Sequence, residues 1–86
     1  MTPDELLRLY PRETLRWLRR RLGLSQLAFG LHLDIAQETV ASWESRRHAI
    51  SDAHRAQLAA LLAPHLATLA GAAFVWSLGR GEASDE

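Results

Sequence analysis

The residues best suited to specific chemistry are polar side chains between positions 26 and 47. They are Gln26, Gln37, Glu38, Thr39, Ser42, Arg46 and Arg47. A glutamine can hydrogen-bond both polar atoms of an adenine edge, a glutamate can accept from cytosine N4, and a serine can do either. Arginine pairs with phosphates through parallel hydrogen bonds. If one surface presents them together, these side chains indicate recognition of nucleic acid.

Catalytic and metal chemistry find no support in the sequence. Neither a disulfide nor a thiolate metal site can form, because the 86 residues include no cysteine. The four histidines are scattered without metal-ligand spacing, and we interpret them as surface or packing residues: His32, His48, His54 and His65. We see no nucleophile–base motif and no phosphate-binding loop. The sequence therefore predicts a protein that is not an enzyme and requires no metal or cofactor.

The charge is balanced in number but uneven along the chain. Ten arginines oppose ten acidic residues. Six of the arginines crowd the first quarter of the sequence: Arg8, Arg12, Arg16, Arg19, Arg20 and Arg21. A neutral chain can still present one basic face. Consecutive helical residues point in different directions, so the run 19–21 cannot face one partner as a whole, and a solvated face explains it equally well.

Capping residues and apolar spacing predict an all-α chain, a compact bundle of five to six short helices. The predicted helices span residues 3–10, 11–22, 26–33, 37–45, 52–63 and 64–78. Thr2, Ser25 and Ser51 are the expected N-caps. Gly23 is expected to end the second helix in a left-handed conformation, after a core stripe formed by Leu15, Leu18 and Leu22.

The third and fourth helices, joined by a short turn at Asp34, have the layout of a helix-turn-helix. We expect Gly30 to face the fourth helix, where a close crossing leaves no room for a side chain. An apolar wedge should fix that crossing: Phe29, Leu33, Ile35, Val40 and Trp43. The fourth helix then turns its other residues outward: Gln37, Glu38, Ala41 and Ser42.

This segment closely resembles the Cro/repressor-type (XRE-like) helix-turn-helix family. The matching positions are Leu24-Ser25-Gln26, Gly30, the turn at Asp34, then Thr39, Val40, Trp43 and Glu44. The resemblance covers about residues 15–62 and implies a lambda-repressor-like DNA-binding fold. It makes the fourth helix the recognition helix, with base contacts from Gln37, Glu38 and Ser42. Phosphate contacts would come from Gln26, Thr39, Arg46 and Arg47.

Several positions depart from the family pattern or carry a structural alternative. Asp34 stands where glycine is usual, and Ala36 replaces the usual hydroxyl N-cap. Glu38 is the weakest base contact, because phosphates repel a carboxylate, and it can instead pair with Arg46 or Arg47. The Gly common after Trp-Glu is replaced by Ser45-Arg46.

The resemblance also implies a scaffold contact, a largely buried ion pair between Arg19 and Glu44. Glu44 follows the core residue Trp43 and should lose water on folding, so it needs a compensating cation. Arginine can supply two parallel hydrogen bonds to a carboxylate. Such a pair would hold the recognition helix against the helix of residues 11–22. The alternative is that both side chains point into water.

Some apolar residues lie off the expected core stripes, namely Trp17, Leu27 and Leu31. The sixth helix adds more apolar surface: Leu66, Leu69, Ala70, Ala73, Phe74 and Trp76. This helix either folds back to complete the core or forms a dimer interface. We expect a homodimer, with Leu69, Phe74 and Trp76 at the interface or at a protein-partner surface. The apolar stretch 66–78 is too short and too rich in alanine to predict a membrane span.

These features predict one helix-turn-helix domain (residues 1–63), an apolar helix (64–79) and a flexible acidic tail (80–86). The leading hypothesis is a sequence-specific transcriptional regulator, a repressor that binds double-stranded DNA at a two-fold-symmetric operator as a dimer. Two alternatives remain, the antitoxin of a toxin–antitoxin pair and a helix-turn-helix module that binds protein and not DNA. With no export signal at the N-terminus, we expect a cytoplasmic, nucleoid-associated protein.

Overall fold

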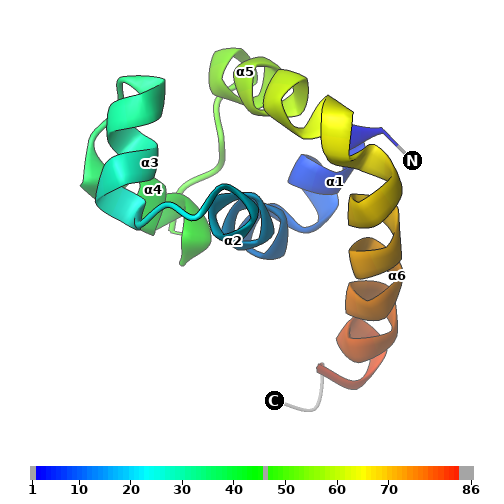
Figure 1. The fold of residues 1–86 in the computed structure, drawn as a ribbon. Helices are drawn as coiled ribbons and strands as arrows, with labels where there is room; N and C mark the ends of the chain where they lie inside the picture. The colour runs from blue at the N-terminus through cyan, green and yellow to red at the C-terminus, as the bar shows by residue number, and fades with distance from the viewer. Residues whose placement is uncertain (1, 46, 84–86) are drawn as a thin grey trace.

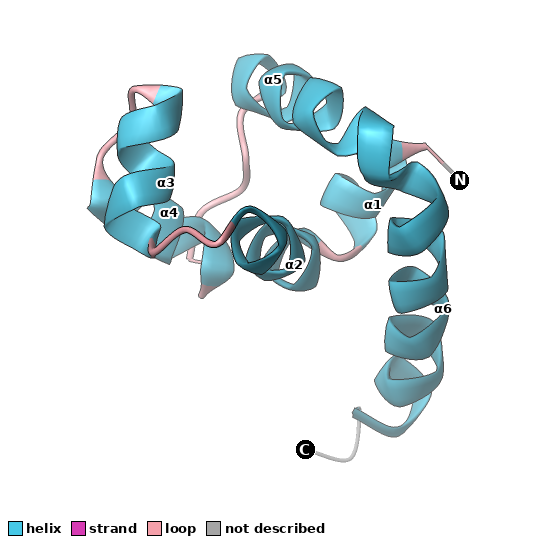
Figure 2. Ribbon diagram, in the orientation of Figure 1, coloured by secondary structure: helices cyan, strands magenta, loops and turns pink. Residues whose placement is uncertain are grey.

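The computed structural model of the protein describes residues 2–45 and 47–83, with side chains described as far as Leu78. Every regular element in these residues is a helix (Figure 2). In chain order they are α1 (Pro3–Leu9), α2 (Pro11–Leu22), α3 (Gln26–Leu33), α4 (Gln37–Glu44), α5 (Asp52–Leu62), the 3-10 helix η1 (Ala63–His65) and α6 (Leu66–Ala83). The predicted all-α bundle is confirmed.

Helix α2 is the centre of the arrangement, packing against α1, α4 and α6, while α1 also packs against α5. Figure 1 shows α3 and α4 together at one end of the molecule and α6 at the other. The Cα radius of gyration is 12.4 Å, close to the roughly 12 Å expected of a compact chain of this length. The helix-turn-helix segment and the C-terminal helix are thus separate parts of the surface.

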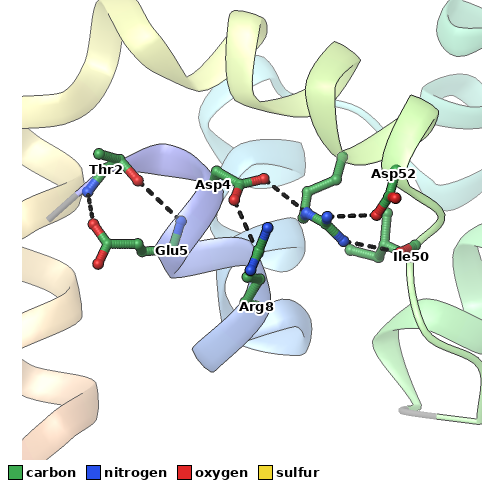
Figure 3. A network of polar contacts seen from close by, with 7 residues as sticks. Thr2, Asp4, Glu5, Arg8, Ile50 and Asp52 are labelled. Carbon is green, nitrogen blue, oxygen red and sulfur yellow. Dashed lines mark hydrogen bonds and ion pairs between the residues drawn. The ribbon is translucent and has the colours of Figure 1, made fainter.

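The helix termini follow the capping signals. Thr2 and Glu5 form a capping box at the start of α1 (Figure 3). The Thr2 backbone N–H donates to the exposed Glu5 carboxylate, and this hydrogen bond lowers the pKa of Glu5. Ser25 and Ser51 each accept a backbone N–H three residues on. Gly23 ends α2 with a φ of 70°. The predicted starts of these helices are therefore confirmed, and the ends of α1, α4 and α5 come one residue earlier than predicted.

The core draws on every α-helix. Its fully or nearly fully buried apolar members are Leu6, Leu7, Leu15, Leu18, Phe29, Leu33, Val40, Trp43, Ile50, Leu58, Leu62, Leu69 and Ala73. The prediction for Leu22 was wrong, because this side chain is 40% exposed. Leu22 lies in the last turn of α2, and Leu24, beyond the turn, packs against the core instead.

The C-terminal third differs from the prediction at both ends of α6. Pro64 lies inside η1, so α6 begins two residues later at Leu66, and it runs through Gly79 and Gly81 to Ala83. A glycine inside a helix costs only about 1 kcal/mol, which is too little to stop it. By length and composition alone, Asp52–Leu78 could cross a membrane. This is weak evidence, since core helices pass the same test, and Figure 1 shows α5 and α6 meeting at an angle.

Helix α6 folds back onto the bundle and completes the core. Leu69 is fully buried within the chain, so its assignment to a dimer surface is corrected: an interior side chain cannot meet a second copy. The Trp76 ring packs on Tyr10 at 6.1 Å between centroids, and His65 meets the Trp17 ring edge-on at the same separation. Phe74 is 65% exposed. Only the outer side of α6 is therefore open to a partner.

Candidate nucleic-acid interface

The crossing of α3 and α4 depends on Gly30. A Cβ atom at this position would lie 2.6 Å from the backbone oxygen of Ile35, a distance that real Cβ atoms do not tolerate. The Ile35 N–H in turn donates to the Gly30 carbonyl, at 2.8 Å. Asp34 makes the turn between the helices with a φ of 60°, a left-handed conformation that aspartate can adopt. The close approach predicted for Gly30 is confirmed.

Helix α4 buries one side and exposes the other. Val40 and Trp43 are buried against the core, as expected. Gln37 and Glu38, in the first turn, are exposed, whereas Ser42, one turn further on, is half-buried. Ala36 precedes the helix in extended conformation and its side chain caps nothing. The first turn of α4 is therefore the part of the helix that a ligand can reach most easily.

The last turn of α4 is attached to α2 by a bidentate ion pair. Arg19 donates from Nε to Glu44 Oε2 at 2.7 Å and from Nη2 to Oε1 at 3.0 Å. The Glu44 side chain is only 6% exposed and that of Arg19 only 16%. The hydrogen bonds to Glu44 raise the pKa of Arg19 above its usual value. Arg19 Nη1 also donates to the Leu24 carbonyl at 3.1 Å, which fixes the loop between α2 and α3.

Gln26, predicted as a phosphate contact, is drawn into the same cluster. Its Nε2 donates to Glu44 Oε1 at 3.3 Å, so the first turn of α3 is tied to the last turn of α4. A side-chain amide carries two N–H groups, and one of them remains for an outside acceptor. The side chain is half-buried. Gln26 therefore has a structural contact that sequence reasoning did not foresee.

The other expected phosphate contacts are less closely grouped. Thr39 is half-buried on α4, and Arg46 lies outside the described residues. Arg47 is exposed just beyond α4, and its backbone N–H donates to the Ser42 carbonyl at 2.9 Å. Within residues 2–45 and 47–78, Glu38 forms no ion pair with Arg47. The structure brings Gln37 and Glu38 together on the first turn of α4, whereas Thr39 is half-buried and Arg47 lies in open solvent beyond the helix.

Two functional candidates were missed by sequence reasoning, Arg12 and Arg16. Together with Arg19 they form one stripe of α2, at spacings of four and three residues. This stripe lines an open cleft of about 450 Å³ between α2, α3 and α4. The complete lining is Arg12, Arg16, Arg19, Gln26, Ala41, Glu44 and Ser45. The spacing of these arginines was the signal in the sequence that could have indicated a shared face of α2.

A second open cleft, of about 600 Å³, lies on the neighbouring side of α2, facing α6. Its lining combines two tryptophans with charged residues: Glu13, Arg16, Trp17, Arg20, Arg21 and Trp76. The Arg21 guanidinium lies 5.7 Å from the centre of the Trp17 ring.

No group of three metal-ligating side chains occurs among the described residues. Comparisons of the chain with protein-family models, with curated proteins and with solved structures returned no match.

Proposed function

We propose that the protein is a sequence-specific DNA-binding regulator, a repressor whose recognition helix is α4. The observation that carries this proposal is the difference between the two ends of α4. Its last turn is fixed to α2 and α3 through Glu44, and its first turn exposes Gln37 and Glu38. Recognition helices present their N-terminal residues to base edges in the major groove. A helix held firmly at its far end keeps such contacts in register.

In vitro selection from random duplexes tests this proposal. It should return a defined site, on which Gln37→Ala weakens binding by about 1–3 kcal/mol and relaxes the preference at one base pair per half-site. Gln57→Ala on α5 is the matched control, because Gln57 is also exposed but lies outside the motif. Arg47→Ala should weaken every duplex alike. Equal losses for Gln37→Ala on all sequences would make Gln37 a backbone contact and reject its role in reading bases.

Binding as a homodimer is part of the proposal. Helix α6 exposes the apolar residues Phe74, Val75 and Leu78, and an apolar groove of about 240 Å³ lies between α1 and α6. Phe74 also lines that groove, together with Leu6, Tyr10, Ala70, Ala73 and Ser77. In a two-fold interface the same surface meets itself, so a projecting ring beside a groove can be satisfied by its symmetric copy. The recognition helices would then lie about 34 Å apart.

Sedimentation with and without the selected DNA tests the dimer. Phe74→Asp should give monomers that bind the operator weakly, since Phe74 is largely exposed and its loss leaves the core intact. Trp76→Asp is the contrasting variant, because Trp76 packs on Tyr10 and its replacement should also lower the stability of the fold. Monomers alone at high micromolar concentration, in the presence of the operator, would reject the dimer.

One observation favours a second candidate, a module that binds a protein partner. Leu27 and Leu31 on α3 are 53% and 74% exposed, and α6 does not cover them. This candidate predicts that Leu31→Ser abolishes partner capture and that selection enriches no DNA site. Enrichment of a site that Leu31→Ser still binds would reject it in favour of the regulator.

A further inference from the structure

The cleft beside α4 carries more positive charge than its own acidic group can balance. Three arginines, Arg12, Arg16 and Arg19, line it, against the single carboxylate of Glu44. We infer that this cleft, called here the arginine cleft, binds a phosphate of the DNA backbone through Arg12 and Arg16. The inference rests on the proposed function and extends it, because both residues lie on α2, outside the helix-turn-helix motif.

The hydrogen bonds show which charges are already used. Arg19 gives Nε and Nη2 to Glu44 and Nη1 to the Leu24 carbonyl, so each of its three nitrogens already donates to a protein atom. Glu44 is thereby neutralised. Arg16 lies further off, with its Nε 3.9 Å from Glu44 Oε1, and its side chain is 39% exposed. Arg12 is exposed and has no ion-pair partner within the part of the chain that the structure describes. Two positive charges remain for an outside anion.

The position of the arginine cleft identifies that anion as backbone phosphate. Ala41 and Ser45, which line the cleft, follow Gln37 at intervals of four residues and so continue its stripe along α4. A ligand that contacts Gln37 and follows this stripe therefore passes the opening of the cleft. When a recognition helix lies in the major groove, the backbone that borders the groove passes the adjoining helices. Phosphate contacts of this kind fix the register of a protein on its duplex.

Two other residues of the lining, Ala41 and Gln26, also favour the binding of a phosphate in the cleft. The alanine side chain is small, so α4 leaves the guanidinium groups open from its own side. The second N–H of the Gln26 amide is available beside them, since only the first is bonded to Glu44. A phosphate oxygen in the cleft would meet donors from α2 and α3 at once. Because Glu44 holds both helices, the same residue that fixes α4 also fixes these donors.

The test is the salt dependence of binding to the selected duplex, compared between two arginine variants of the same helix. Arg12→Gln removes a cleft donor. Arg21→Gln is the matched control, because Arg21 is nine positions away, about 180° around the helix, and lies over Trp17. Both variants lower the net charge equally. Thermal unfolding of each variant verifies that it is folded.

We expect Arg12→Gln to weaken binding to the selected and to a scrambled duplex alike, and to reduce the salt slope by about 0.9, the value for one phosphate. Arg21→Gln should leave the slope unchanged. Equal slopes for Arg12→Gln and wild type would overturn the assignment of the cleft while leaving DNA binding intact. Weaker binding of inorganic phosphate without a change in DNA slope would overturn it too, since the ligand would then be a free anion. If the wild type binds no duplex, the proposed function itself fails.

Discussion

Two arginine-centred networks join helices that are distant in sequence. Comparing them shows which contact between helices should be more costly to break. Arg19 reaches Glu44, 25 residues on, and Arg55 reaches back 51 residues to Asp4. Each Nε–carboxylate distance is 2.7 Å, and each arginine also bonds a backbone carbonyl five residues away. The two arginine side chains are equally exposed, at 16%.

The carboxylates in the two networks differ. Glu44 is 6% exposed, whereas Asp4 is 40% exposed and Asp52, which also bonds Arg55, is 93% exposed. Figure 3 shows the Asp4 side chain pointing from α1 toward α5, with Arg8 as a further partner. Water can replace the partners of Asp4 but can hardly reach Glu44. The network beneath α4 should therefore be costly to break, and the network at α1 should not.

Arg19→Met gives the largest expected effect. It strands the buried carboxylate of Glu44 and should lower the free energy of unfolding by about 3–5 kcal/mol. Glu44→Gln keeps an acceptor oxygen for the arginine and should cost about 1.5–3 kcal/mol, the range for a hydrogen bond to a charged group. The double variant should cost less than the two losses together. Urea unfolding measures all three, and a nearly native curve for Arg19→Met would remove the contrast.

Gly30→Ala tests whether the contact between α3 and α4 is equally costly to disturb. The new methyl group would press on the Ile35 carbonyl, a backbone atom that cannot swing aside. Overpacking of this kind costs about 1–3 kcal/mol. Gly71→Ala is the matched control, since a Cβ there meets nothing within 4 Å and alanine favours helix. Thermal unfolding should place the first variant below the wild type and the second at or above it.

Ala36→Ser should strengthen the free end of α4. Ala36 has the extended conformation of an N-cap but no side-chain bond, whereas Ser25 at the start of α3 accepts the Ala28 N–H at 3.1 Å. A serine cap should add about 1 kcal/mol to the stability. The reverse change, Ser25→Ala, should remove a similar amount. A loss of stability in Ala36→Ser would show that the first turn of α4 is constrained by something other than its missing cap.

Asp4→Asn should give the smallest effect. Exposed ion pairs contribute about 0–1 kcal/mol, and salt screens them. The free energy of unfolding should therefore change little, and the remaining difference should shrink when the ionic strength is raised. A loss as large as that of Arg19→Met would mean that carboxylate exposure does not distinguish the two networks.

Local signals in the sequence were sufficient for most of the fold. The caps at Thr2, Ser25 and Ser51 and the left-handed Gly23 depend on neighbours within a few residues, so their roles were predictable. The close approach at Gly30 follows from the layout of two short helices.

Among the features that depend on several helices, the Arg19–Glu44 pair was predicted from the family resemblance, but others were not. Helix α6 carries apolar residues all round, so its sequence does not indicate that Leu69 faces inward while Phe74 faces out. The arginine cleft exists only where α2, α3 and α4 meet, and Gln26 turns to Glu44 only because the ion pair brings that carboxylate near. The sequence of one helix does not show which other helices will lie beside it.

The central claim, that α4 reads DNA sequence, is tested most directly by one ratio. The affinity of the wild-type protein for its selected duplex is divided by its affinity for a scrambled duplex of equal length, at the same physiological salt. The account predicts a ratio of at least about 10³, the lower end for specific DNA-binding proteins. Equal affinity for the two duplexes would contradict it, because the exposed first turn of α4 would then read no bases.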